Sequence, residues 1–109
     1  MSGTVEWQPK TVSEVISRYA DFTDELANNE IVTSAGAAVT VYSGNDLAPN
    51  NIILSLTIIA NTAGVNAVIQ VNLQNGVLGT LYQCVVTANT NQSRSITKSA
   101  VLAIKPPLN

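Results

Sequence analysis

Histidine is absent from the 109 residues of this chain, and cysteine occurs once. Histidine is the commonest general base and the commonest metal ligand in proteins. Its absence excludes Ser-His-Asp and Cys-His arrangements for nucleophilic catalysis. A single cysteine, Cys84, excludes an intrachain disulfide and indicates synthesis in a reducing cytoplasm. We expect Cys84 to be buried and inert, because nothing basic lies near it in sequence.

Aromatic residues and long apolar runs are also scarce. Paired carboxylates can hydrolyse glycosides, but such sites need aromatic platforms and a cleft, for which this chain has few residues. No apolar run reaches the roughly 18 to 20 residues of a membrane-spanning helix. The N-terminus lacks the basic and apolar regions of a signal peptide. We therefore expect neither an enzyme nor a membrane protein.

Charge is distributed unevenly along the chain. All seven acidic residues occur at or before Asp46, and no charged residue occurs from 47 to 93. The formal net charge is −2, whereas phosphate contacts need a basic stripe, so nucleic-acid binding is not expected. Solitary domains usually intersperse charges on their surface. A neutral, amide-rich face is better suited to lying against other subunits, where a desolvated charge is costly.

The apolar residues make up 46% of the chain and are mostly aliphatic, which favours strands packed face to face. Short alternating segments recur with turn-forming residues between them. The predicted strands cover residues 16–22, 30–34, 38–43, 52–60, 67–74, 82–88 and 94–104. The pattern predicts an all-β antiparallel sandwich over residues 15–105. The segment 52–60 is apolar on both faces, with Leu54 and Leu56 inward, so we expect it to be central or covered.

Residues 1–14 are expected to form an N-terminal arm and turn, and residues 106–109 a C-terminal tail. Thr11 and Glu14 have the spacing of a capping box, which indicates a turn before the first strand. Trp7 is the only tryptophan and lies in the arm. Because buried indoles are common interface anchors, Trp7 is a candidate docking residue. The alternative is that Trp7 covers the core of its own sandwich.

The stretch 76–87 organises the predicted core. Gly76 and Gly79 supply turn positions that accept positive φ, and Tyr82 then precedes Cys84 by two residues on a strand. This is the position of the tyrosine corner in immunoglobulin-like sandwiches, where the phenol hydroxyl bonds to upstream backbone. We predict this structural role for Tyr82, without the antibody-type disulfide.

Other polar and aromatic residues are candidates for binding. The acidic residues between 21 and 30 could surround a calcium ion, but their spacing matches no known loop, so we expect a solvated turn and no metal. Trp7, Tyr19 and Tyr42 could stack on a sugar. Tyr42 lies on the outward register of its strand, although an exposed cross-strand tyrosine is the simpler interpretation.

Several short motifs occur in a fixed order along the chain. They are Pro9-Lys10, Glu14-Val15, Tyr19-x-Asp21-Phe22, Leu26, Glu30 to Ser34, Gly44-Asn45-Asp46, Gly76-x-x-Gly79-Thr80-x-Tyr82 and Val86-Thr87. In these motifs most of the chain resembles a family of small tailed-bacteriophage virion proteins, described as phage tail proteins or fibre-tail adaptors. The hairpin 89–93 departs from the family, because relatives commonly carry a glycine there.

The resemblance implies an immunoglobulin-like sandwich of about seven strands with an N-terminal arm. It implies a non-enzymatic structural subunit of the virion, made in the bacterial host cytoplasm, and it transfers no catalytic, cofactor or metal residue. A tail or fibre adaptor is the expected role, with a capsid decoration (cement) protein or a carbohydrate-binding module as alternatives. Multiple copies would dock onto tail, fibre or capsid subunits through the arm around Trp7 and the neutral face bearing Val68, Gln70 and Asn72.

Overall fold

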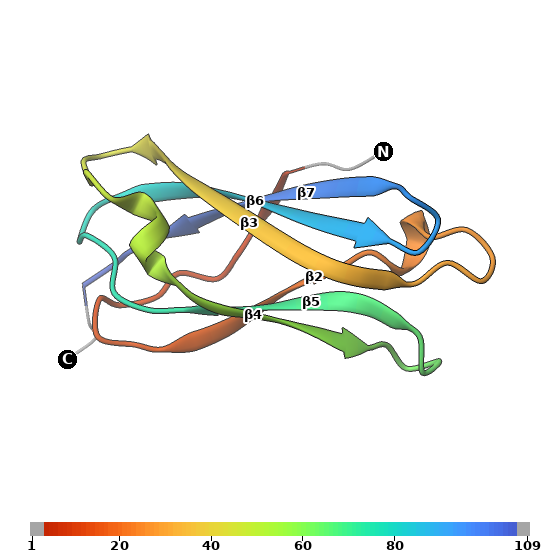
Figure 1. Ribbon diagram of the computed structural model, residues 1–109. Helices are drawn as coiled ribbons and strands as arrows, with labels where there is room; N and C mark the ends of the chain where they lie inside the picture. Colours follow the sequence, from red (N-terminus) through yellow and green to blue (C-terminus); the bar gives the residue numbers. More distant parts are fainter. Residues whose placement is uncertain (1–3, 107–109) are drawn as a thin grey trace.

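A computed structural model describes residues 4–106 as an all-β sandwich (Figure 1). In chain order its elements are β1 (Thr4–Glu6), β2 (Ile16–Asp21), the 3-10 helix η1 (Thr23–Glu25), β3 (Val32–Ser43), the 3-10 helix η2 (Pro49–Ile52), β4 (Ile53–Ala60), β5 (Asn66–Leu73), β6 (Leu81–Thr90) and β7 (Ser95–Ala103). A sheet in the order β1-β7-β6-β3 packs on a sheet in the order β2-β5-β4. The predicted all-β sandwich is therefore confirmed. Neither 3-10 turn in this part of the chain has the length to cross a membrane.

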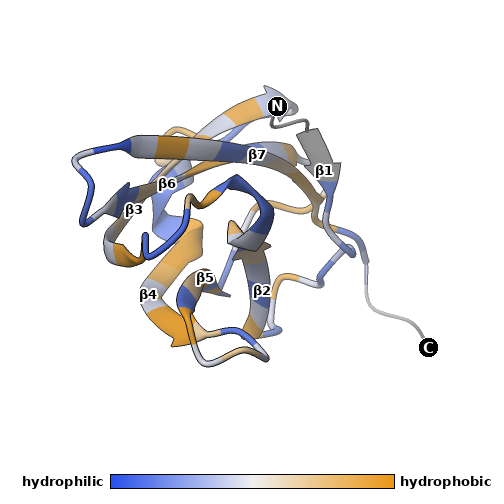
Figure 2. Cartoon of the chain, turned by 90° about the vertical axis from the view of Figure 1, so that its right-hand side faces the viewer, coloured by the Kyte–Doolittle hydropathy of each residue, from blue (hydrophilic) through white to orange (hydrophobic). Residues whose placement is uncertain are grey.

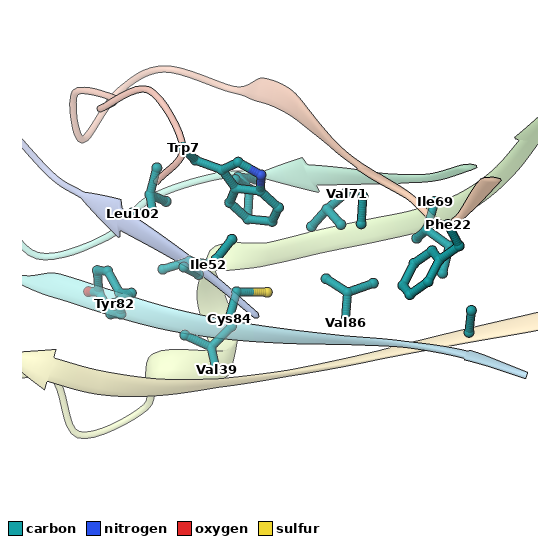
Figure 3. Close-up of a cluster of buried hydrophobic side chains, with 14 of the residues drawn as sticks. Trp7, Phe22, Val39, Ile52, Ile69, Val71, Tyr82, Cys84, Val86 and Leu102 are labelled. Atoms are coloured by element: carbon teal, nitrogen blue, oxygen red, sulfur yellow. The ribbon is translucent and has the colours of Figure 1, made fainter. Parts of the chain in front are cut away.

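The core lies between the two sheets, and β5 and β6 supply most of it from their inward positions. The inward residues of β6 are Tyr82, Cys84, Val86 and Ala88, each at most 1% exposed, and they alternate strictly with half-buried residues. The inward residues of β5 are fully buried too, but its outward Val68 is also buried, so β5 alternates strictly only from Ile69 onward (Figure 3). Both strands are central in their sheets, so one face of each is sealed against the other sheet. This agrees with the alternation expected from the sequence.

Strand β3 is continuous, whereas the sequence predicted separate strands at 30–34 and 38–43, with a break or bulge at Ala35-Gly36 between them. Ala35 and Gly36 pair in regular register with β6, and the irregularities lie near the two ends of the strand. The long pairing with β6 therefore overrides the local tendency of glycine to end a strand. The outer edge of β3 is partly closed, because the Val39 N–H donates to Asn50 Oδ1 at 2.8 Å.

Strand β4 lies at the edge of its sheet, whereas the sequence predicted a strand that is central or covered by a neighbour. Its pairing with β5 shifts register between Ile53 and Ser55, so Leu54 occupies a bulge and is 51% exposed. Beyond the bulge Leu56 and Ile58 pack against the core. The single extra residue reverses which side chains face inward, so alternation assigned Leu54 to the wrong face.

The predicted arm is bound to its own sandwich from residue 4 onward. Strand β1 runs parallel to β7, the one parallel pair among the strands named above. The backbone N–H of Trp7 donates to Val101 O at 2.9 Å, and the backbone N–H of Lys10 donates to Ala103 O at 3.1 Å. The following turn holds the predicted capping contact, in which Thr11 N–H donates to Glu14 Oε1 at 2.7 Å. The rest of the predicted arm and tail, residues 1–3 and 107–109, lies outside the described residues.

Candidate interaction site

Nine side chains in three rows form the outward side of the three-stranded sheet, which we call the outer face. The rows are Ser17–Asn72–Ser55, Tyr19–Gln70–Thr57 and Asp21–Val68–Ile59. Strand β5 lies between β2 and β4, so the structure places Val68, Gln70 and Asn72 together along the centre of this face. Gln70 and Asn72 are half-buried, whereas Val68 is only 9% exposed and offers little surface to a partner. Alternation had predicted their outward orientation, and their role in contacts stays a prediction.

Amide and hydroxyl groups on the outer face bond to one another. Ser17 Oγ donates to Asn72 Oδ1 at 2.6 Å, and Gln70 Nε2 donates to the same oxygen at 2.9 Å. Asn72 Nδ2 in turn donates to Ser55 Oγ at 2.8 Å. The bonds cross all three strands and fix the side chains in place. A preorganised face loses less side-chain entropy when a second surface packs on it.

Asp21 is the one charged side chain in these three rows, and it lies at a corner. Its Oδ1 accepts bonds from the Thr23 hydroxyl at 2.5 Å and the Thr23 N–H at 2.9 Å. The hydroxyl bond, followed by the N–H bond, lowers the pKa of Asp21. A partner could therefore cover most of the outer face without desolvating a charge, which is the main penalty in polar interfaces.

The edge of β4 adds an open strand beside the outer face. Strand β4 pairs with β5 on one side and with no other strand of residues 4–106. It contains neither charge nor proline, and Figure 2 shows much of it in the hydrophobic colour. Natural sheets usually protect such edges with charged residues, proline or a covering segment. Sequence reasoning missed this edge, because the apolar residues on both faces indicated a strand that is central or covered.

The indole of Trp7 is part of the core and is not an exposed docking group, which corrects the docking hypothesis. The side chain is 7% exposed and packs in the buried cluster between the sheets (Figure 3). Its backbone is held along β7, and this directs the indole inward. The alternative, that Trp7 covers its own core, is the one the structure shows.

A cavity of about 230 Å³ opens beside Trp7. Its lining comes from the arm, β2, β6 and β7, and consists of Trp7, Tyr19, Ala20, Asp21, Val86, Lys98, Ser99 and Ala100. The structure thus brings together Trp7 and Tyr19, two of the three aromatic residues considered for sugar binding. Tyr42 is 66% exposed on β3, at the far edge of the other sheet, and does not line this cavity.

Tyr82 makes the structural bond that the sequence predicted. The Val77 N–H donates to Tyr82 Oη at 2.9 Å, and the ring is fully buried. The hydroxyl also donates to Asp46 Oδ2 at 2.6 Å, a contact that the sequence did not reveal. Burial, reinforced by this bond, raises the pKa of Tyr82 to about 12. Cys84 is buried as expected, and burial raises the pKa of its thiol to about 11.

Glu30 is buried in an ion pair, so the expectation of a solvated acidic turn is wrong at this residue. Arg94 Nε donates to Glu30 Oε2 at 2.8 Å, and Arg94 Nη2 lies 2.5 Å from Oε1. Thr90 Oγ1 and the Ala27 N–H donate to the same carboxylate. The Arg94 bonds, with help from Ala27 and Thr90, lower the pKa of Glu30 to about 2. Within residues 4–106 no cluster of three or more Asp, Glu, Cys or His is placed to hold a metal.

We expect acid to destabilise the protein as the pH falls from about 4.5 to about 2, the interval between the ordinary and the folded pKa of Glu30. Because folding lowers the pKa of Glu30, its carboxylate contributes fully to the free energy of unfolding above this pH interval. That contribution is lost as the pH falls through the interval. Glu30→Gln should be less stable at neutral pH, and its Tm should fall less steeply across the interval. Thermal unfolding at a series of pH values measures this. Asp24→Asn, an exposed carboxylate of the same turn, is the control, and parallel curves for wild type and Glu30→Gln would contradict the assignment.

A scan of the chain against protein-family models finds no match, and a search of curated protein sequences finds none either. A functional assignment therefore depends on two things. One is the geometry of the outer face, the β4 edge and the cavity beside Trp7. The other is the set of motifs found in the sequence.

Proposed function

We propose that this protein is a non-enzymatic structural subunit of a tailed-bacteriophage particle, acting as a tail or fibre adaptor. The outer face and the adjoining edge of β4 are its contact surface for other virion proteins. The observation that carries the proposal is the neutral, hydrogen-bonded outer face centred on Gln70 and Asn72. The motifs shared with small phage virion proteins supply the class of partner.

The strand order supports an immunoglobulin-like identity for the sandwich, with seven strands. Strands β2, β5 and β4 take the places of B, E and D, and β3, β6 and β7 those of C, F and G. Tyr82 then lies near the start of strand F, where the tyrosine corner belongs. Strand β1 differs from the first strand of a constant-type domain, because it pairs with β7 and not with β2.

The physical case for docking through the outer face rests on what burial would cost there. Four of its polar side chains, Ser17, Ser55, Gln70 and Asn72, already bond to one another, so a covering subunit leaves fewer polar groups unpaired. The β4 edge offers backbone groups for strand addition from a neighbour. Repeated around a symmetric particle, individually weak contacts of this kind add up to firm attachment.

Gln70→Lys is expected to reduce incorporation into particles by at least about tenfold, because it buries an ammonium in the centre of the contact. Gln83→Lys is the matched control, since Gln83 is a half-buried glutamine on the central strand of the other sheet. Both variants are purified, checked for folding by circular dichroism and added to particles that lack the protein. Equal incorporation of the two variants would contradict docking through the outer face. Absence of the wild-type protein from particles would contradict the virion role itself.

The same particles distinguish an adaptor from a capsid decoration protein. Quantitative mass spectrometry gives the copy number relative to the major capsid protein. A small number that follows the rotational symmetry of the tail supports the adaptor. A copy number comparable with that of the major capsid protein would contradict the adaptor and support a capsid decoration protein.

A further inference from the structure

The cavity beside Trp7 has a buried apolar floor. Trp7, Ala20, Val86 and Ala100 are all nearly inaccessible to solvent, yet each lines the cavity. Tyr19, which is 54% exposed, contributes a second aromatic residue at the opening. An apolar floor flanked by aromatic residues favours a ligand with a flat or ring-shaped apolar surface.

Polar groups of both signs line the opening of this cavity. Asp21 accepts its hydrogen bonds through Oδ1, and its Oδ2 accepts none from residues 4–106. Lys98 also lines the cavity, with its Nζ 2.9 Å from Glu25 Oε1, and Ser99 adds a hydroxyl. The lining thus carries an ammonium together with a carboxylate, so neither sign of charge dominates at the opening.

Trp7, which lines the cavity, also carries an indole N–H. It donates to no residue of the described chain, although buried tryptophans usually find a partner for this group. An acceptor atom bound in the cavity would satisfy this donor, whereas a purely apolar ligand would leave it unpaired.

We infer that this cavity binds a single hydroxylated ring, such as one pyranose unit of a glycan. The hydroxyl oxygens of the ring accept hydrogen bonds from the indole N–H of Trp7 and from the Lys98 ammonium, and one of its hydroxyl groups donates to Asp21 Oδ2. The C–H face of the ring lies on the apolar floor. The volume of about 230 Å³ is below the roughly 300–1,000 Å³ of pockets for larger ligands, which matches one ring. The cavity and the outer face share Tyr19 and Asp21 at their border, but the contact centre at Gln70 does not line the cavity.

Trp7 is the only tryptophan of the chain, so its signals report on the cavity directly. We would titrate the full-length protein with methyl glycosides of glucose, galactose, mannose and N-acetylglucosamine. Tryptophan fluorescence and the NMR shift of the indole N–H are the two readouts. At least one glycoside should give a saturable change at millimolar concentration. Tyr19→Ala should weaken that binding by at least about tenfold.

Tyr42→Ala is the matched control, because Tyr42 is also an exposed strand tyrosine but lies on β3. Both tyrosines are exposed, so both variants are expected to fold, and unfolding curves check this. Unchanged indole signals with every glycoside would overturn the inference. So would equal weakening by the two substitutions, or tighter binding of acetate or methylammonium than of any glycoside. Particle incorporation is a separate assay, so failure of this inference leaves the proposed virion role standing.

Discussion

Replacing Trp7 by alanine is expected to lower the free energy of unfolding by about 3–5 kcal/mol. The indole fills part of the core between the two sheets and is 7% exposed (Figure 3). Its removal leaves a cavity that paired strands on both sides cannot close. Urea denaturation measures the loss, which is a large part of the about 5–15 kcal/mol that stabilises a typical domain.

The comparison with Tyr42→Ala makes the Trp7 result specific. Tyr42 is another large aromatic residue, but its exposure predicts a change within about 0.5 kcal/mol. An equally small change for Trp7→Ala would contradict its place in the core and restore it as an exposed docking residue. If the large loss is found, poor incorporation of Trp7→Ala into particles reflects unfolding and says nothing about contacts with other subunits.

Periodicity predicted the interior strands of the two sheets, each of which has one face packed against the opposite sheet. Strands β5 and β6 are central, so every second residue faces the core, and burial alternates strictly along β6 and from Ile69 onward on β5. The Tyr82 hydroxyl bond was predictable for a related reason. The partner of the hydroxyl, the Val77 N–H, is only five residues upstream, so the bond depends on the local turn and not on distant pairing.

Alternation could not predict which strands are neighbours. The sequence pattern of residues 52–60 indicates burial, but it does not say whether a strand is central, and β4 is an edge strand with a bulge at Leu54. The arm was misjudged for the same reason. Its partner β7 is almost the whole chain length away, and the pairing of Thr4 with Ser99 has no local signal.

The Glu30–Arg94 pair shows the same limit for charges. The two residues are 64 positions apart, and the segment 24–30 by itself has the sequence of a polar turn. Only the fold brings the Arg94 hairpin over Glu30 and excludes water from the carboxylate. The neutral outer face, in contrast, was predictable. Residues 47–93 contain no charge, so any part of the protein surface that they form must be neutral, whatever the strand order.

Gly76→Ala is expected to destabilise the protein by about 2–5 kcal/mol, from two separate causes. Gly76 has φ +104°, where an alanine is strained by about 1–2 kcal/mol. An added Cβ would also lie 2.7 Å from Ile104 Cδ1, and overpacking of this kind adds about 1–3 kcal/mol. Thermal and urea unfolding of the purified variant measure the sum.

Gly79→Ala separates the two causes, because Gly79 shares the turn and has φ +80° but open space around its Cβ position. It should cost only the strain, about 1–2 kcal/mol. Ile104→Val removes Cδ1, so the double variant with Gly76→Ala should recover part of the packing loss, which a double-mutant cycle measures as coupling. Equal losses for the two glycine variants and no coupling to Ile104 would contradict the predicted clash. With coupling, Gly76 is required so that the turn can pack on Ile104 beside the Tyr82 ring, while Gly79 is required only for backbone conformation.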